Sequence, residues 1–337
     1  MFNKKTIIIA EAGVNHNGKL TNALKLVDVA SKSGADIIKF QTFKAENLVT
    51  KKAKKAKYQI KNTNIIETQY KMLKKIELKR DYHFKIIKYC KKKKIKFLST
   101  GFDIEDIKFL ISECKLDIIK VPSGEITNLP YLKYIAKLNK IIFLSTGMAN
   151  FREIKFAYNI LIKFGTLKKN IFVLHCITEY PAENKILNLK AIEFLKDKLN
   201  TNQIGYSDHS DNIISPTVAV SLGAKVIEKH FTLNKNMNGP DHKASLNPNE
   251  LKQMIENIRE TEKMLGVRNK IVTTPEKKNL KIARKSIVAK KNITKGDIFS
   301  DKNITSKRPG TGVSPIYWYK YLGKKSKKNY KKDEFIK

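Results

Sequence analysis

Two histidines in the second half of the chain have neighbours that suit a metal site. His209 follows the apolar run in "IGYSDHSD", and His230 ends the run in "VIEKHFT". Their separation far exceeds the roughly three to five residues between histidines that bind metal from one local motif. Two neutral imidazoles with open positions suit Mn²⁺, Fe²⁺, Co²⁺ or Zn²⁺ better than Ca²⁺. Alternatively, one or both are hydrogen-bonded structural histidines, and the decision depends on whether the fold brings the two runs together.

The elements that must position these histidines form one repeating pattern from residue 6 to residue 265. Short runs rich in Ile, Val and Phe alternate with longer stretches of helical periodicity. Runs that are apolar throughout are typical of a parallel sheet covered on both faces. Eight such units predict an α/β fold, a (β/α)8 TIM barrel, and a doubly wound sheet is disfavoured because no Gly-rich nucleotide fingerprint follows the first run. The runs span residues 6–13, 35–43, 95–102, 116–125, 140–148, 170–180, 202–209 and 224–232.

Polar residues stand at the end of every predicted strand, where a barrel gathers its chemistry. They are Glu11, Lys39, Gln41, Ser99, Thr100, Lys120, Ser123, Glu125, Ser145, Thr146, His175, Tyr180, Ser207, Asp208, His209, Glu228 and His230. Lysines followed by hydroxyl and backbone donors suit a phosphate group. His209 and His230 end neighbouring strands, which lie about 4.8 Å apart in a closed sheet. Their imidazoles are therefore able to share one divalent ion.

We do not expect the histidines at positions 16, 83 and 242 to bind the metal ion. We expect His16 in a loop near the mouth of the barrel and His83 in a structural position on a helix. His242 follows Asp241 in "NGPDHKAS", just after the last strand, where it could face a substrate.

The domain organisation changes after residue 265. Residues 1–265 form the predicted barrel domain, and residues 266–282 lose the strand–helix rhythm and are interpreted as a linker. Residues 283–337 contain short strands and turns, which indicate a small β-rich module. A module of this size has only marginal stability by itself, so we expect it to lean on another surface.

The formal net charge of +37 raises the question of a nucleic-acid partner. Nearly all the basic residues are lysines scattered over helical faces, whereas readers of bases and phosphates favour the arginine fork. We therefore expect no nucleic-acid partner, and a positive surface that helps to collect anionic substrates.

Several features predict a cytoplasmic protein without a membrane partner. No apolar run approaches the roughly 18 residues that span a bilayer. The start "MFNKKTIIIAEAG" has the basic front of a signal peptide, but Glu11 interrupts its apolar run, so we interpret it as a first buried strand. Cys90, Cys114 and Cys176 lack paired spacing, which fits buried thiols in a reducing compartment.

Several motifs together resemble the sialic acid synthase family, in the order found there. The motifs are "IIIAEAGVNHNG", "IIKFQTFKAENLV", "KVPSGEITNLPYL", "FLSTGMA", "YSDHS", "IEKHFT", "GPDHKASL" and "KRPGTG". The resemblance covers essentially the full length, including a C-terminal antifreeze-like (SAF) module. It is strongest to the N-acetylneuraminate synthase and legionaminic acid synthase branch.

This resemblance implies an enzyme that condenses phosphoenolpyruvate (PEP) with an N-acylated amino sugar to give a nine-carbon 2-keto acid and phosphate. It implies Mn²⁺ or Mg²⁺, with Co²⁺ as a further candidate, bound by His209 and His230. The residues implied to hold PEP are Lys39, Thr100, Lys120, Ser123, Ser145 and Ser207. The residues implied to surround the sugar are Glu11, Gln41, Glu125, Tyr180 and Asp241, and the catalytic base would be Glu125 or Glu11.

Arg308, in "KRPGTG", is implied to reach the N-acyl group from the antifreeze-like module of a partner subunit, which makes the expected active unit a domain-swapped homodimer. The chain departs from the family pattern in two places. Gly101 replaces the usual proline after Thr100 and would loosen that backbone. The second proline that usually follows Tyr180-Pro181 is missing in "YPAEN", and Thr178 nearby stands where some relatives use an asparagine contact to PEP.

Three functional hypotheses follow. The first is an N-acetylneuraminate synthase that uses N-acetylmannosamine. The second keeps the chemistry but uses a 2,4-diacetamido-2,4,6-trideoxy-hexose, which would make the chain a legionaminic or pseudaminic acid synthase. The third belongs to another class, a non-catalytic, lysine-rich binding protein on a barrel scaffold.

Overall fold

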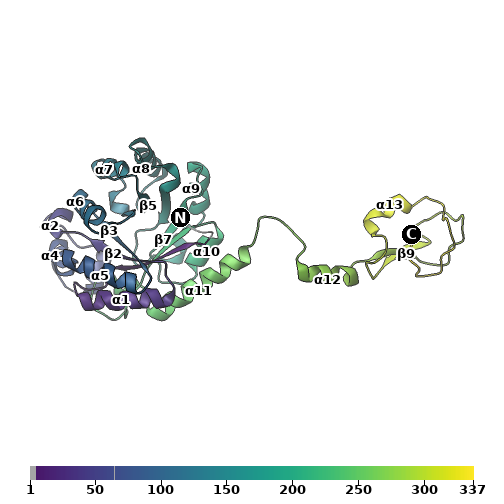
Figure 1. The fold of residues 1–337 in the computed structure, drawn as a ribbon, viewed down its shortest axis with the longest axis horizontal. Coiled ribbons are helices and arrows are strands. Elements are labelled where there is room, and N and C mark those ends of the chain that lie inside the picture. Colours follow the sequence, from purple (N-terminus) through teal and green to yellow (C-terminus); the bar gives the residue numbers. More distant parts are fainter. Residues whose placement is uncertain (1–4, 64) are drawn as a thin grey trace. The chain divides into compact units, whose positions relative to one another are not determined.

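The computed structural model describes residues 5–63 and 65–337. The chain divides into two compact units, the first ending at Gly266 and the second beginning at Val267 (Figure 1). Each unit is described by itself.

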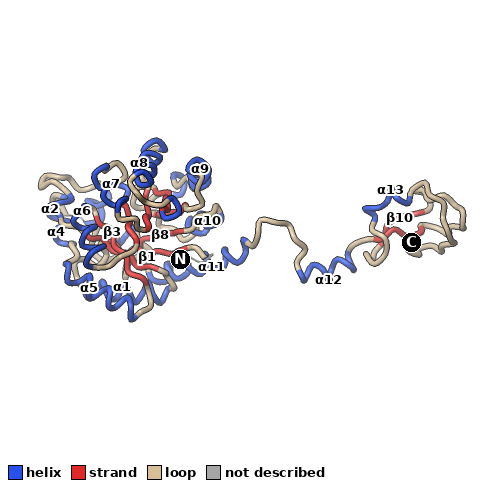
Figure 2. Tube along the Cα trace, turned by 45° about the horizontal axis from the view of Figure 1, so that its top comes forward, coloured by secondary structure: helices blue, strands red, loops and turns tan. Residues whose placement is uncertain are grey.

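The first unit is a closed, all-parallel barrel of eight strands within the described residues, so the predicted (β/α)8 fold is confirmed. Each strand pairs with the next along the chain, and β8 pairs with β1 to close the sheet. Helices surround the strands (Figure 2). The strands are β1 (Ile7–Gly13), β2 (Ile37–Thr42), β3 (Lys96–Gly101), β4 (Ile118–Val121), β5 (Ile141–Ser145), β6 (Ile171–Cys176), β7 (Ile204–Asp208) and β8 (Val226–His230).

The helices of this unit begin and end at residues suited to those positions. Asn150 caps α8 and Asn247 caps α11, each in a reciprocal pair with a glutamate three residues later. Gly34 ends α1 in the left-handed conformation. The helices are α1 (Leu20–Ser33), α2 (Ala45–Leu48), α3 (Lys57–Thr63), α4 (Gln69–Ile76), α5 (Arg80–Lys92), α6 (Ile104–Lys108), α7 (Leu129–Lys137), α8 (Phe151–Lys163), α9 (Ala191–Leu199), α10 (Ser215–Ser221) and α11 (Pro248–Leu265). Shorter helical turns are Phe109–Glu113, Ser123–Glu125, Lys168–Asn170, Asn184–Ile186 and His242–Ala244.

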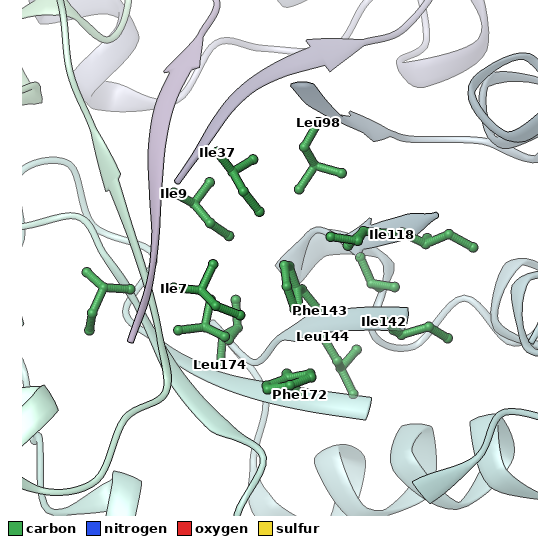
Figure 3. Close-up of a cluster of buried hydrophobic side chains, with 14 of the residues drawn as sticks. Ile7, Ile9, Ile37, Leu98, Ile118, Ile142, Phe143, Leu144, Phe172 and Leu174 are labelled. Carbon is green, nitrogen blue, oxygen red and sulfur yellow. The ribbon is translucent and has the colours of Figure 1, made fainter. Parts of the chain in front are cut away.

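The barrel interior changes character along each strand. Apolar side chains such as Ile9, Ile37 and Leu98 gather between the strands (Figure 3). Side chains two residues apart share one face of a strand. Glu11 therefore follows Ile9 on the inward face, and Lys39 follows Ile37. The apolar half closes the core and leaves the polar half at the carboxyl ends of the strands.

Polar residues of the opposite parity face the surrounding helices instead. The Thr42 hydroxyl lies 2.7 Å from His83 Nε2 and 2.6 Å from Ser99 Oγ, so β2, β3 and α5 are joined behind the barrel wall. The structural role predicted for His83 is confirmed. His175 Nε2 lies 2.7 Å from the Leu187 carbonyl, which places this imidazole outside the cluster expected at the mouth.

The second unit has its own small core around a two-stranded antiparallel sheet. Its elements are α12 (Thr274–Ala283), β9 (Ser286–Ala289), β10 (Ile304–Lys307), the turn Pro315–Tyr317 and α13 (Trp318–Tyr321). The buried core residues are Ile287, Ala289, Ile293, Phe299, Ile304, Tyr330 and Ile336. Part of the predicted linker is helical, because Thr273 and Glu276 form a capping box that starts α12.

No helix within the part of the chain that the structure describes is long and apolar enough to cross a membrane.

Asp106 in α6 provides a test of this packing through pH. It is 2% exposed, and its Oδ2 has no hydrogen-bond partner among the described residues. Burial, followed by the nearby charge of Asp103, raises the pKa of the Asp106 carboxyl from 3.8 to about 7. The folded state therefore holds this proton more tightly than the unfolded chain does. The resulting stabilisation is full below the unfolded pKa and is lost as the pH rises through about 7.

Asp106→Asn has no such titration. We therefore expect the difference in unfolding free energy between this variant and the wild type to shift in favour of the variant as the pH rises from about 5 to about 8. The gain is on the order of 1 kcal/mol or more, because a tenfold change in proton affinity corresponds to about 1.4 kcal/mol. Urea unfolding at both pH values measures it, with Asp81→Asn, an exposed carboxylate on α5, as the control. A difference from wild type that does not change with pH would contradict the expectation.

Candidate active site

The carboxyl ends of the barrel strands surround a cavity of about 230 Å³. Residues predicted from widely separated parts of the chain meet in its wall. They are Glu11, Lys39, Gln41, Thr100, Lys120, Ser123, Ser145, Tyr180, Ser207, His209, His230 and Asp241.

Two buried lysines and two buried carboxylates form the floor of this cavity. Lys39 Nζ lies 2.9 Å from Glu11 Oε2 and 3.6 Å from Glu228 Oε1. Lys120 Nζ lies 3.3 Å from the same oxygen of Glu228. The Ser207 hydroxyl donates to that oxygen at 3.2 Å. Two ammonium groups thus converge on one carboxylate in a place that water scarcely reaches.

The two carboxyl groups of this cluster differ in pKa. Burial alone would raise the pKa of Glu228, but Lys120 and Lys39 outweigh it and hold that pKa at about 2. Burial, opposed by Lys39 and reinforced by Glu228, raises the pKa of Glu11 to about 7. Glu228 is therefore ionised at neutral pH, whereas Glu11 is able to gain or lose a proton there. Such a cluster can accept an anion and can also move a proton.

The two histidines face each other across the cavity, with ring centroids 5.4 Å apart. His209 Nδ1 lies 2.7 Å from the Ile177 carbonyl, and a proton donated in this contact leaves Nε2 unprotonated, with the Tyr180 hydroxyl 3.1 Å from it. His230 Nδ1 is buried without a hydrogen-bond partner among the described residues. Burial, together with His209 and Lys39, lowers the pKa of His230 well below its ordinary value. Burial would lower the pKa of His209, but Cys176 and the Ile177 carbonyl outweigh it and raise that pKa. The unbonded nitrogen of His230 and Nε2 of His209 are the two donor atoms that fit the predicted divalent cation.

The described residues contain no group of three or more His, Cys, Asp or Glu side chains arranged to hold a metal ion. A cation bound by His209 and His230 would therefore keep coordination positions open, as a catalytic metal does.

An aromatic stack forms one side of the cavity. Tyr180 lies on His209 at a centroid distance of 4.1 Å, and its hydroxyl is 3.1 Å from His209 Nε2. Tyr58 from α3 stacks on the other face of Tyr180 at 5.0 Å. Asp241 faces the same space, and burial raises the pKa of its carboxyl to about 6. A ring face beside a carboxyl and hydroxyls suits a polar molecule with apolar faces, such as a sugar.

The two departures from the family pattern have defined surroundings. The Gly101 carbonyl accepts a hydrogen bond from the Tyr131 hydroxyl at 2.9 Å, and a Cβ at Gly101 would lie 3.0 Å from Ile107 Cδ1. Thr100 is buried and its hydroxyl accepts from Lys39 Nζ at 2.9 Å. The Tyr131 hydroxyl thus holds this backbone from α7, and a side chain at position 101 would crowd Ile107 in α6. Thr178 also lines the cavity.

Some predicted residues lie elsewhere. Among the described residues that line the cavity, Glu125 is absent: its carboxylate accepts from the Asn128 side chain at 2.6 Å, at the start of α7. Arg308 belongs to the second unit, where it is exposed. The suggestion that His242 faces a substrate is wrong, because its ring nitrogens lie 2.6 Å from the Thr232 hydroxyl and 3.2 Å from Asn17 Oδ1. His16 is fully buried, and its Nδ1 accepts from the Gly18 amide.

Several residues of the cavity wall had no role predicted from the sequence. Glu228 was predicted at a strand end but given no role; its inward parity with His230 is the signal that could have placed it beside the lysines. Cys176 carries the same signal on β6. Tyr58 had none, because nothing local shows that α3 returns to the mouth of the barrel. An apolar wall was also missed, formed by Val14, Met72, Leu73, Ile76 and Phe102.

A closed (β/α)8 barrel with buried lysines, a titratable carboxyl and two facing imidazoles at its mouth defines a barrel enzyme for an anionic substrate. The model described as the NeuB family matches residues 26–270, and the SAF domain model matches residues 284–337. The chain belongs to the NeuB family.

Individual relatives agree with this. An N,N'-diacetyllegionaminic acid synthase of Campylobacter jejuni is 56% identical over 333 residues, 99% of this chain and 99% of the relative. One from Legionella pneumophila is 44% identical over 91% of this chain and 86% of the relative. The solved N-acetylneuraminic acid (sialic acid) synthetase of Leptospira borgpetersenii, in complex with citrate, has a TM-score of 0.72 at 32% identity, covering 82% of this chain and 90% of that one. The chain is thus an enzyme of the synthase type.

Gly147 gives a test of the wall geometry. Its amide donates to Ser123 Oγ at 3.0 Å, and an added Cβ would lie 2.7 Å from that oxygen and 2.1 Å from Thr178 Oγ1. We expect Gly147→Ala to displace Ser123 and to weaken the binding of PEP by about tenfold or more. Calorimetric titration with PEP measures this. The control is Gly124→Ala in the same wall, where the methyl group meets no described atom within 4 Å. Equal affinities of the two variants would refute the expectation.

Proposed function

We propose that this enzyme joins C3 of PEP to the aldehyde carbon of an open-chain N-acylated amino sugar, adds water at C2 and releases phosphate. The observation that carries the proposal is the cluster of Lys39, Lys120, Glu11 and Glu228 beside the two imidazoles. It combines an anion site, a titratable carboxyl and a candidate cation site within one cavity. The family membership supplies the reaction class.

The sugar that we propose is a 2,4-diacetamido-2,4,6-trideoxy-hexose, and N-acetylmannosamine is the less supported choice. The relatives at 56% and 44% identity are named for N,N'-diacetyllegionaminic acid, whereas the sialic acid synthetase is 32% identical. The apolar wall around Met72, Leu73 and Ile76 supports the same choice. A 6-deoxy sugar presents a methyl group at C6 and carries a second acetyl methyl, and both prefer an apolar surface to water.

Lys39 and Lys120 would hold the phosphate and carboxylate of PEP. The negative charge of PEP would then neutralise these ammonium groups in place of part of the charge of Glu11 and Glu228. Thr100, Ser123, Ser145 and Ser207 line the same part of the cavity as hydroxyl donors. These contacts fix the reacting carbon of PEP against the sugar aldehyde.

His209 and His230 would hold a divalent cation, Mn²⁺ or Mg²⁺, which supplies Lewis-acid polarisation of the aldehyde oxygen when bound. Tyr180 and Asp241 would orient the sugar, with Gln41 beside them at 3.4 Å from Glu11.

Proton transfer falls to Glu11. When C3 of PEP attacks the aldehyde carbon, positive character develops at C2, and a water molecule adds there. Glu11 takes the proton of this water, since its pKa of about 7 leaves a basic carboxylate available at neutral pH. The tetrahedral carbon then expels phosphate: the bond from C2 to the phosphate ester oxygen breaks, the proton of the C2 hydroxyl goes to the departing phosphate, and the ketone forms. The proton held by Glu11 passes to the former aldehyde oxygen, which becomes a hydroxyl. Glu125, the other candidate base, lies outside the cavity wall and is the weaker choice.

The second unit would complete the site of a partner subunit in a homodimer. Arg308 is exposed on the loop after β10, and Ser286 holds that loop through a hydrogen bond to the Pro309 carbonyl at 2.7 Å. A guanidinium presented in this way is suited to the carbonyl of an N-acyl group.

The proposal is tested by phosphate release from PEP with Mn²⁺, comparing the diacetamido-trideoxy-hexose with N-acetylmannosamine. We expect release that depends on the added sugar, with the larger kcat/KM for the diacetamido sugar. A larger kcat/KM for N-acetylmannosamine would contradict the proposed sugar and identify the enzyme as an N-acetylneuraminate synthase. No release with any amino sugar would leave a binding protein on a barrel scaffold, contrary to the proposal.

His230→Ala tests the cation site. Losing one of two imidazoles should reduce kcat/KM by about two orders of magnitude in the presence of metal. Mn²⁺ affinity should fall in parallel, and the circular dichroism spectrum should stay unchanged. His242→Asn, at a buried histidine outside the cavity, is the control and should bind Mn²⁺ like the wild type. Full activity of the wild type or of His230→Ala after metal removal would contradict the assignment of His230 as a metal ligand.

A further inference from the structure

A buried ion pair lies directly behind the two facing histidines. Asp208 precedes His209 at the end of β7, and Lys229 precedes His230 on β8. The strand register places Asp208 opposite Lys229. Because successive side chains of a strand point to opposite faces, the pair faces the helices while the two imidazoles face the cavity.

The pair is almost fully removed from water and fully bonded. Lys229 Nζ lies 2.6 Å from Asp208 Oδ2, and the side chains are 1% and 0% exposed. The Tyr206 hydroxyl and the Ser210 amide donate to Oδ1 of Asp208 at 3.0 and 2.8 Å. The Ser215 hydroxyl at the start of α10 donates to Oδ2 at 2.7 Å. A carboxylate with this many directed donors has one stable position.

The ammonium group of Lys229 also bonds on the far side of His209. It donates to the Ser210 carbonyl at 2.7 Å and to the Ser210 hydroxyl at 3.0 Å. Lys229 therefore ties the residues before and after His209 to the residue that precedes His230. A shift of either histidine backbone relative to the other stretches at least one of these short bonds.

We propose that Lys229 and Asp208 are positioning residues that set the separation of the His209 and His230 imidazoles for a shared divalent cation. This inference rests on the cation site of the proposed function. Neither side chain lines the cavity in the described structure, so the pair acts through the histidines and makes no contact with substrate.

The test is Mn²⁺ binding to metal-free protein, followed by electron paramagnetic resonance of the free ion. Lys229→Met leaves the Asp208 charge without its partner and removes the bonds that tie Asp208 and Ser210 to β8. We expect Mn²⁺ to bind about 10- to 100-fold more weakly, the effect typical of groups that orient metal ligands. The affinity for PEP, whose lysines stand on β2 and β4, should change far less.

The matched control is Arg259→Met. Arg259 in α11 bonds Asp36 at 2.9 Å and the Thr6 carbonyl at 2.8 Å, at the amino-terminal end of the barrel. This variant also loses a partly buried ion pair, and thermal unfolding without metal compares the stability losses of the two variants. We expect Arg259→Met to bind Mn²⁺ like the wild type.

The outcomes separate the hypotheses. Wild-type Mn²⁺ affinity in Lys229→Met overturns the positioning role, as does an equal loss in Arg259→Met. If the wild type itself binds no Mn²⁺, the proposed cation site fails, and this inference fails with it. If Lys229→Met does not fold, the double variant Asp208→Asn with Lys229→Met, which leaves no charge at the position of this pair, takes its place. Wild-type Mn²⁺ affinity in that double variant also overturns the inference.

Discussion

Charge buried at the mouth of a closed barrel is the constraint on which the rest of this structure depends. Lys39 and Lys120 are each less than 5% exposed, and an uncompensated ammonium group there would be very costly. Glu228 compensates both, and Glu11 compensates Lys39. The compensation is incomplete once Glu11 holds a proton, so this cluster of two lysines and two carboxyl groups then carries one net positive charge. An anionic substrate is the natural partner of such a site.

Barrel closure makes this arrangement possible. Each strand contributes only one or two inward polar side chains above its apolar half, so no single strand holds a site. Closure pairs β8 with β1 and places Glu11 directly opposite His230 in the strand register. The titratable carboxyl and a candidate metal ligand thus become neighbours although they stand at opposite ends of the barrel sequence.

The strand number, the barrel and most of the cavity wall were predictable, because they follow from apolar runs with polar ends. Strand parity separates the strand-end residues further: Cys176 faces the cavity, and the adjacent His175 bonds the Leu187 carbonyl outside it. Tyr58 was not predictable, since its stacking on Tyr180 depends on a long connection between β2 and β3 that carries no local signal. The same limit applies to Glu125, which a short helical turn directs to Asn128.

Strands β7 and β8 carry His209 and His230 on their cavity face and the Asp208–Lys229 ion pair on their helix face. The histidines explain why a charged pair stands there and not two apolar residues. A buried ion pair adds little net stability, because desolvation offsets most of its attraction. An apolar pair tolerates small shifts between strands, whereas the Asp208 carboxylate accepts from four directed donors at once. The Asp208–Lys229 pair thus fixes the relative position of β7 and β8, in addition to filling space between the strands and the helices. Two imidazoles 5.4 Å apart would need this fixed geometry to share the proposed cation, because a metal ion accepts ligands only within a few tenths of an ångström of its preferred distances.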